Sequence, residues 1–196
     1  MKTLISFAAI AAATISLPTV AIAQAVPGAT VAVVDLERVT SQCTACKTAL
    51  TALQSQISSL RARQTALATP LEAEQKSIQA AITALNGAQP DAALTARVKA
   101  FQTKQQQGAQ EMSSREQQIQ RNQAYVNQQI AQKLGPIYQQ VMQKRGANVM
   151  VERGAVLAAA SGVDVTADVL TALNAALPAL STTAPAAPAQ SQPQGR

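Results

Sequence analysis

Two cysteines three residues apart, Cys43 and Cys46, have the greatest chemical potential in this chain of 196 residues. Such a pair can form a local disulfide, exchange thiols or anchor a c-type haem. Haem attachment normally requires a histidine after the second cysteine, but Lys47 stands there and the chain contains no histidine. The sequence therefore favours a structural disulfide, with free thiols, thiol exchange and metal binding as alternatives.

Other residues that could carry out catalysis are scarce. Without histidine the chain cannot build a Ser-His triad, and two cysteines alone do not complete a tetrahedral zinc shell. Glu72 and Glu74 lie two residues apart and so point away from each other on a helix. Asp164 and Asp168 are better explained as charges at a helix start. We therefore expect no enzyme activity, no cofactor and no bound metal.

The cysteine pair stands at the start of a long helical pattern. Residues 29–36 are rich in β-branched side chains and predict a strand, after which Thr40 or Ser41 can cap a helix. Apolar residues then recur at helical steps and whole heptads, as in the seam of a coiled coil. They are Leu50, Leu53, Ile57, Leu60, Leu67, Leu71, Ile78 and Leu85.

Asn86-Gly87 interrupts this pattern, which resumes after Asp91. The second seam contains Leu94, Val98, Phe101, Met112, Ile119 and Val126, then, after a phase shift, Ile130, Leu134, Ile137 and Val141. Two helices joined by a short loop fold back antiparallel, and at 1.5 Å per residue an arm of roughly 43 residues reaches about 65 Å. The sequence thus predicts a helical hairpin arm over 41–145 with its tip near 86–90. Pro70 predicts a kink, and Gly135-Pro136 a kink or a break.

The segment after Gly146 predicts the rest of a small body. Residues 148–152 and 155–159 flank Arg153-Gly154 and favour a β-hairpin, and a last short helix follows, ending at Pro178. The expected fold class is α+β, with a β-rich body made of 24–40 and 146–177. The Ser, Thr, Ala, Pro and Gln-rich segment 178–196 is predicted to be disordered.

The first 23 residues have the pattern of a cleavable export signal. Met1-Lys2 gives a positive start, an apolar stretch without charge follows, and Ala21-Ile22-Ala23 is a small-x-small cleavage site. An apolar core of about 14 residues is too short to span a bilayer, which requires roughly 20. The mature protein is expected outside the cytoplasm, in the periplasm of a Gram-negative host.

The predicted arm carries most of the positive charge. Between residues 41 and 145 there are twelve basic and five acidic residues, a net charge of +7. A basic extended surface attracts acidic polypeptides or anionic lipid, including lipopolysaccharide, and export makes nucleic acid the least suitable partner. Alternatively, these charges only solvate the helices. The candidate binding residues are Arg61, Arg63, Lys76, Arg97, Lys99 and Lys104.

The predicted body is too small to be comfortably stable alone. It has about 49 residues, close to the size at which a single core is marginal and association is often needed. The residues expected to find cover on another copy are Val31, Val33, Val149, Val151, Val156 and Leu157. In the arm, fifteen glutamines between 102 and 143, and polar or small seam residues such as Gln105, Gly108 and Asn122, predict a weak seam.

Several stretches of this sequence resemble one known family, the OmpH/Skp chaperones. They are the export signal, Val31-Ala-Val-Val-Asp-Leu before a Gln/Ala-rich helical hairpin, Gly135-Pro-Ile-Tyr, Gly146-Ala-Asn-Val-Met-Val, Gly154-Ala-Val-Leu-Ala-Ala and Asp164-Val-Thr-Ala-Asp-Val-Leu. The resemblance covers residues 29–177. The Cys43/Cys46 pair and the tail after 177 depart from the family's pattern.

The resemblance implies a periplasmic holdase. It also implies a homotrimer with a small β-rich body and three helical tentacles. The tentacles would enclose a cavity in which unfolded outer-membrane proteins are kept soluble. Two other classes of function stay open at this point. One is a structural or adaptor coiled coil of the cell envelope, and the other is a thiol oxidoreductase that uses Cys43 and Cys46.

Overall fold

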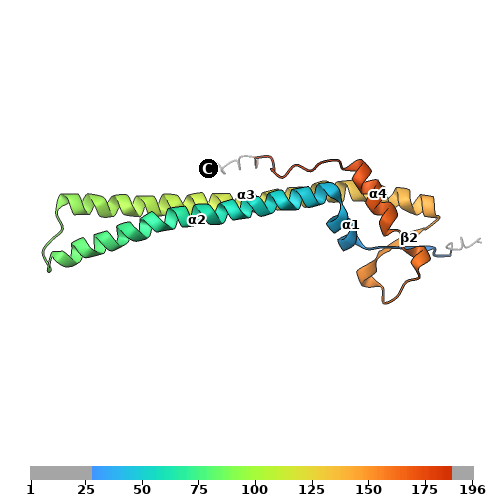
Figure 1. Ribbon diagram of the computed structural model, residues 1–196, viewed down its shortest axis with the longest axis horizontal. Coiled ribbons are helices and arrows are strands. Elements are labelled where there is room, and N and C mark those ends of the chain that lie inside the picture. The colour runs from blue at the N-terminus through green and yellow to red at the C-terminus, as the bar shows by residue number, and fades with distance from the viewer. Residues whose placement is uncertain (1–27, 187–196) are drawn as a thin grey trace, which may run out of the picture.

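The computed structural model describes residues 28–186, and the predicted export signal lies outside the described residues. The molecule is elongated, with a long helical hairpin that extends from a small body (Figure 1). Its elements are β1 (Val31–Val34), α1 (Leu36–Gln42), α2 (Thr44–Ala84), α3 (Ala92–Arg145), β2 (Val149–Glu152), the 3-10 turns η1 (Arg153–Ala155) and η2 (Ser161–Val163), and α4 (Thr166–Ala176). Among the described residues, no helix is both long and apolar enough to cross a membrane.

The arm consists of α2 and α3, which run antiparallel and pack along their length (Figure 1). The chain reverses over residues 85–91, where Asn86 and Gly87 have φ angles of 49° and 90°. Asparagine and glycine tolerate this left-handed region better than other residues. Asp91 then caps α3, because its carboxylate accepts a hydrogen bond from the Leu94 backbone N–H at 2.7 Å. The hairpin turn therefore lies where the Asn-Gly pair predicts it.

Pro136 does not break α3, which runs on to Arg145. A proline removes one helical hydrogen bond, but Leu134, Ile137 and Val141 on both sides of it are buried at 7%, 4% and 3% exposure. Packing against the body holds the helix continuous through the proline. Of the two alternatives at Gly135-Pro136, the break is wrong. Gly146 then ends α3 in the left-handed conformation, with φ 67°.

The body has one apolar core, to which β1, α1, α2, α3 and α4 all contribute. Val39, Val169 and Leu173 are completely shielded from solvent. The cluster also contains Ala32, Val34, Cys43, Cys46, Leu134, Ile137, Val141 and Val165. Because four helices, α1 to α4, supply most of these side chains, the body is mainly helical, and the expectation of a β-rich body is corrected to a helical body with a two-stranded sheet.

The sheet pairs β1 with β2 in parallel, with Val31 opposite Val149 and Val33 opposite Val151. The β-hairpin predicted from 148–152 and 155–159 is therefore wrong. Parallel strands need a long crossover connection, and the whole arm supplies it here. Residues 155–159 form no strand. The other edge of β1 contacts Asp164 and the Val165 N–H, which donates to the Val33 carbonyl at 2.9 Å.

The chain after α4 returns along the arm. Figure 1 shows this C-terminal segment, in red, lying beside the hairpin for part of its length. Residues 178–186 therefore have a defined path, whereas the sequence predicts disorder from residue 178. The rest of that predicted tail lies outside the described residues.

Candidate functional site

Two of the six basic residues predicted to bind partners, Arg63 and Arg97, form ion pairs that join the two helices of the arm. Arg63 of α2 donates two hydrogen bonds to the Glu111 carboxylate of α3, at 2.9 and 2.8 Å. Arg97 of α3 does the same to Glu74 of α2, at 2.7 and 3.1 Å. Bidentate Arg–carboxylate pairs fix geometry as well as charge. We call these two pairs the arm clamps.

The clamps also perturb the titration of their acids. Arg63 and then Arg115 donate hydrogen bonds to Glu111, and these lower its pKa to about 2. The hydrogen bonds from Arg97 likewise lower the pKa of Glu74. Lowering the pKa of these two carboxyl groups favours their ionised form, which is the form that pairs with arginine.

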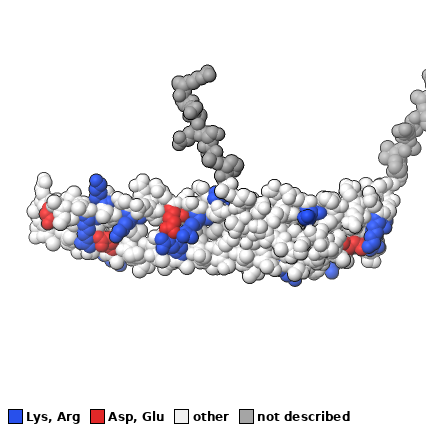
Figure 2. Space-filling model, turned by 90° about the horizontal axis from the view of Figure 1, so that it is seen from above, with Lys and Arg blue, Asp and Glu red and all other residues white. Residues whose placement is uncertain are grey.

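The other four predicted basic residues, Arg61, Lys76, Lys99 and Lys104, are exposed and form no ion pair among the described residues. On the face shown in Figure 2, basic side chains lie in separate groups along the arm, several of them beside acidic ones. On this face the positive charge of the arm is thus carried by scattered, solvated side chains rather than by one continuous patch.

The seam between the helices is hollowed in two places. The first hollow, of about 450 Å³, lies between the clamps, with Leu67, Pro70, Lys104 and Gly108 among its lining residues. The second, of about 400 Å³, lies nearer the body, where Ser59, Leu60, Arg115 and Ile119 contribute to it. Small and polar side chains at the seam, such as Gly108 and Asn122, do not fill the space between the two helices. A seam of this kind agrees with the weak packing that the sequence predicts.

Three side-chain amides on the arm hold the returning C-terminal segment. Gln56 lies on α2, and Asn122 and Gln129 lie on α3. Together they form hydrogen bonds with backbone groups of Ser181, Thr182 and Ala184. We call these three residues the amide track. Sequence reasoning noted Asn122 only as a polar seam residue and missed the track, because Gln and Asn are frequent in the arm and nothing local distinguishes these three.

The residues predicted for oligomerisation do not share one environment. Val33 is 3% exposed, so the chain itself buries it. Val151 and Val156 are half-buried. Val31 and Val149, which pair across the sheet, are each 39% exposed, and Leu157 is fully exposed. The structure thus leaves three of the six, on β1, β2 and the following loop, as apolar surface.

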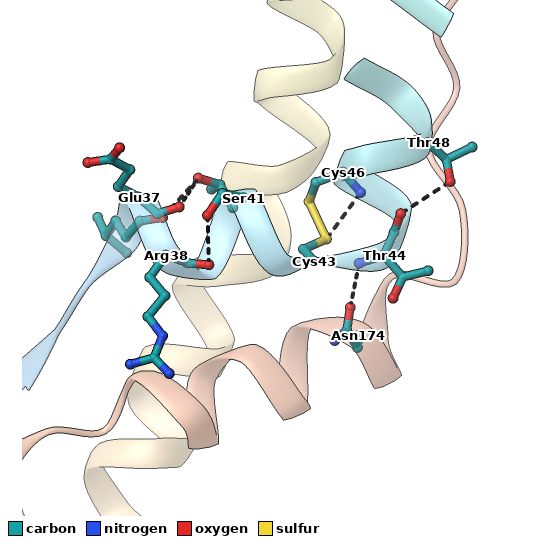
Figure 3. Close-up of a disulfide and its surroundings, with 10 residues drawn as sticks. Glu37, Arg38, Ser41, Cys43, Thr44, Cys46, Thr48 and Asn174 are labelled. Atoms are coloured by element: carbon teal, nitrogen blue, oxygen red, sulfur yellow. Dashed lines mark hydrogen bonds between the residues drawn. A yellow bond between two sulfur atoms is a disulfide. The ribbon is translucent and has the colours of Figure 1, made fainter. Parts of the chain in front are cut away.

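Cys43 and Cys46 form a disulfide at the junction of α1 and α2, with their Cα atoms 5.1 Å apart. Cys43 ends the first helix and caps the second, its sulfur accepting a hydrogen bond from the Cys46 N–H at 3.2 Å. Figure 3 shows this cap beside Asn174 of α4, whose side-chain oxygen accepts from the Thr44 N–H at 2.9 Å. Both sulfur-bearing residues are buried, at 0% and 8% exposure. Thiol exchange requires an accessible sulfur, so this environment suits a structural bond.

Within residues 28–186, His, Cys, Asp and Glu side chains form no group of three or more that could hold a metal ion.

Comparisons with known proteins show which family has this fold. The profile of the family described as outer membrane protein (OmpH-like) matches residues 30–173. The crystal structure of a candidate outer membrane chaperone (OmpH-like) from Caulobacter crescentus CB15 is similar to this one, with a TM-score of 0.65 and 24% sequence identity, and the match covers 81% of this chain and 90% of that one. No curated protein matches the sequence. Since the family profile covers most of the chain, the protein belongs to the OmpH-like family.

Proposed function

We propose that this protein is a periplasmic holdase chaperone, which keeps unfolded outer-membrane proteins soluble until they reach the outer membrane. The observation that carries the proposal is the arm, a helical hairpin that projects beyond its body and whose seam has hollows open to solvent. Membership of the OmpH-like family supports it, as does the fold shared with a protein named as a chaperone candidate.

The chemistry of the arm suits binding without a fixed pocket. A holdase must bind many sequences reversibly, and many weak contacts on one surface achieve this without tight binding at any one of them. Exposed basic residues such as Arg61 and Lys99 raise the encounter rate with acidic segments. The arm therefore acts by binding alone, and no step of the proposed function requires catalysis or a cofactor.

The assembly we propose is a homotrimer formed through the body. Val31, Val149 and Leu157 place apolar side chains in water in the single chain, and β2 is an edge strand of the described sheet. Exposed apolar surface beside a free strand edge is typical of an association surface. Leu157→Asp should weaken the trimer, with Thr171→Asp as the control because Thr171 is exposed on α4. A chain that stays monomeric at micromolar concentration in sedimentation equilibrium contradicts this assembly.

Anionic lipid, including lipopolysaccharide, is a second partner that the exposed basic residues of the arm could attract. Sedimentation with anionic and with neutral vesicles distinguishes this binding from capture of unfolded protein. A chain that pellets with anionic vesicles only, and does not bind unfolded protein, would be a lipid-binding protein instead of a holdase.

The test of the function is suppression of aggregation. An unfolded β-barrel outer-membrane protein is diluted out of urea, and light scattering is followed with and without the mature chain. A matched variant replaces residues 68–107 with a short turn, which removes the outer arm but keeps the clamp between Arg63 and Glu111. Leu67 and Gly108 face each other across the seam, so the cut is in register.

The full chain should abolish most of the scattering and the shortened variant should lose most of this protection while its body stays folded. Equal protection by both forms would place binding on the body. No protection by either form would favour a structural or adaptor role in the envelope.

A further inference from the structure

We propose that the amide track is a binding site for polypeptide backbone outside regular secondary structure, which the chain's own residues 181–184 occupy until a segment of an unfolded client displaces them. The displacement step rests on the proposed chaperone function, whereas the backbone-binding site itself does not.

The docked segment contacts the arm at two separate points. Ser181 contacts Gln129 and Ala184 contacts Asn122, and these two arm residues lie seven positions apart on α3. Between these points the segment bends at Thr183, where the Ser181 hydroxyl bonds to the Thr183 backbone. Burial alternates along it, with Thr182 and Ala184 half-buried and Ser181 and Thr183 exposed. The arm thus binds an irregular segment that forms no hydrogen bonds of a helix or sheet.

Recognition is through the backbone of that segment. Gln129 donates its amide to the Ser181 carbonyl at 2.8 Å and accepts from the Ser181 N–H at 3.1 Å. Gln56 donates to the Thr182 carbonyl at 3.1 Å, and Asn122 accepts from the Ala184 N–H at 2.8 Å. Among the described contacts, the Ser181 hydroxyl bonds only to the segment's own backbone, at Thr183. Every polypeptide offers these N–H and C=O groups, so the track does not depend on the sequence it binds.

The arm residues are held ready for this role. Asn122 is only 4% exposed, and its side chain also accepts from Gln118 and donates to Gln56, both at 2.8 Å. These bonds fix the orientation of the Asn122 oxygen that receives the Ala184 N–H. The Ala184 N–H is therefore a second donor to an oxygen that the arm already holds in place.

The site has room for more chain than the docked segment uses. The second seam hollow, of about 400 Å³, includes Asn122 and Gln56 and continues to Ser59, Leu60 and Arg115, with Thr183 at its border. At the other end, Leu180 packs between the body core and the cluster of Ala49, Leu53 and Val126. A client segment with one apolar residue, followed by a few residues whose backbone groups are free, therefore fits the same path and can continue further along the seam.

The docked segment lowers the apparent affinity of the track for a client, because it competes for the same site. If the segment is docked in about nine molecules of ten, a client that competes for the track binds about tenfold more weakly than it would to the empty track. Such competition keeps short exposed segments of folded proteins out, while a long unfolded chain with contacts elsewhere on the arm overcomes it.

The first experiment tests backbone recognition without any client. A chain that ends at Pro178 is titrated with a fluorescent peptide of residues 178–186, after circular dichroism has shown that its helices are intact. A peptide with residues 181–184 in shuffled order should bind within about twofold of the original. A peptide N-methylated at Ser181 and Ala184, which lacks both N–H donors, should bind at least tenfold more weakly. Equal binding by the methylated peptide, or loss of binding by the shuffled one, overturns the site.

The second experiment tests displacement in the intact protein. Hydrogen exchange of the segment 181–186 is measured in the full chain with and without a saturating unfolded β-barrel protein. We expect the Ala184 amide to be protected in the free chain and to exchange at least tenfold faster in the complex. Protection that persists in the complex overturns displacement, even if the truncated chain should fail to fold.

Two truncated chains test the same displacement by measuring client affinity. Removal of 181–196 should tighten client binding about tenfold, whereas removal of 187–196, which keeps the docked segment, should leave it unchanged. In the chain lacking 181–196, Gln129→Ala should weaken client binding, and Gln128→Ala, at an exposed neighbour, should not. Equal client affinities for both truncations contradict the proposal. If no form binds client while the peptides behave as expected, the chaperone function fails together with displacement, and the backbone site stands.

Discussion

At the scale of single residues, Glu111 shows how the arm uses its few acids. It receives hydrogen bonds from Arg63 across the seam and from Arg115 on its own helix, the latter at 2.8 Å. With only five acidic residues among the seventeen charged ones of the arm region, two of the five, Glu74 and Glu111, are used to join the helices. Arg61, Lys76, Lys99 and Lys104, which form no ion pair among the described residues, keep their charge available to partners.

The pH dependence of arm stability should report on Glu111. Its pKa in the folded chain is about 2, below the ordinary 4.5. A carboxyl whose pKa falls on folding stabilises the fold above the ordinary pKa, and this stabilisation is lost as the pH drops toward the folded value. The thermal midpoint of wild type should therefore exceed that of Glu111→Gln above pH 5, and the two should converge by about pH 2.

Glu116→Gln is the matched control for that measurement, because it removes the same charge nearby and no ion pair of the described residues. A constant difference between wild type and Glu111→Gln from pH 7 down to pH 2 would show that the clamp is not the source of the effect.

The Cys43–Cys46 disulfide should stabilise the fold only modestly. It closes a very small loop, so the loop-entropy model gives a stabilisation of only about 1–2 kcal/mol. The double variant Cys43→Ser/Cys46→Ser should fold, assemble and suppress aggregation, with a modestly lower melting temperature. Mass spectrometry of the non-reduced wild type should show a mass two hydrogens below that of the reduced chain.

Two outcomes would contradict a structural role for this bond. One is a double variant that keeps its structure but no longer protects clients. The other is rapid reduction of insulin disulfides by the wild type, which would identify a thiol exchange protein.

At the scale of elements, the hairpin is held by a weak seam and two clamps. Exposed ion pairs contribute little to global stability, so the clamps should matter mainly for how closely α2 and α3 stay together. Arg97→Ala should speed hydrogen exchange in the outer arm and leave the body unchanged. Lys99→Ala, two residues away and unpaired among the described residues, should change neither. Exchange that is equally slow in both variants would mean that the seam alone holds the helices.

The hairpin could be predicted from sequence, because its signals are local. The heptad spacing, Asn86-Gly87, the Asp91 cap and Gly146 each act within a few residues, and the structure places a turn or a helix end at each of these positions. The sheet could not be predicted in the same way. Residues 155–159 resemble a strand as much as β2 does, and only the position of β1 across the whole arm decides which of them pairs.

The sequence predicts that the arm is basic, but it does not predict which basic residues form ion pairs. Basic charge on the arm is a matter of composition, yet nothing local shows that Arg63 and Arg97 face acids across the seam while Arg61 and Lys99 do not. The docked segment 181–184 was missed for a related reason. Its composition is typical of disorder, and its order comes from amides more than fifty residues away in the sequence.

At the scale of the whole molecule, scattered positive charge should control how fast clients are captured. Reversal of the four unclamped residues Arg61, Lys76, Lys99 and Lys104 to Glu should slow association severalfold at low salt and flatten its salt dependence, because exposed charges act mainly on encounter rates. The clamps and the body are untouched by these changes. Stopped-flow fluorescence of a labelled unfolded client measures the rate, and an unchanged rate at low salt would remove electrostatic steering from the mechanism.

The most direct test of the central claim is sedimentation velocity of a fluorescently labelled, unfolded β-barrel outer-membrane protein mixed with the mature chain. The proposed holdase predicts that the label sediments as one soluble species, with the mass of one client and three copies of the chain. It also predicts that the variant lacking residues 68–107 fails to form this species. A label that pellets as aggregate in the presence of the intact chain, which itself sediments as a free monomer, would contradict the account.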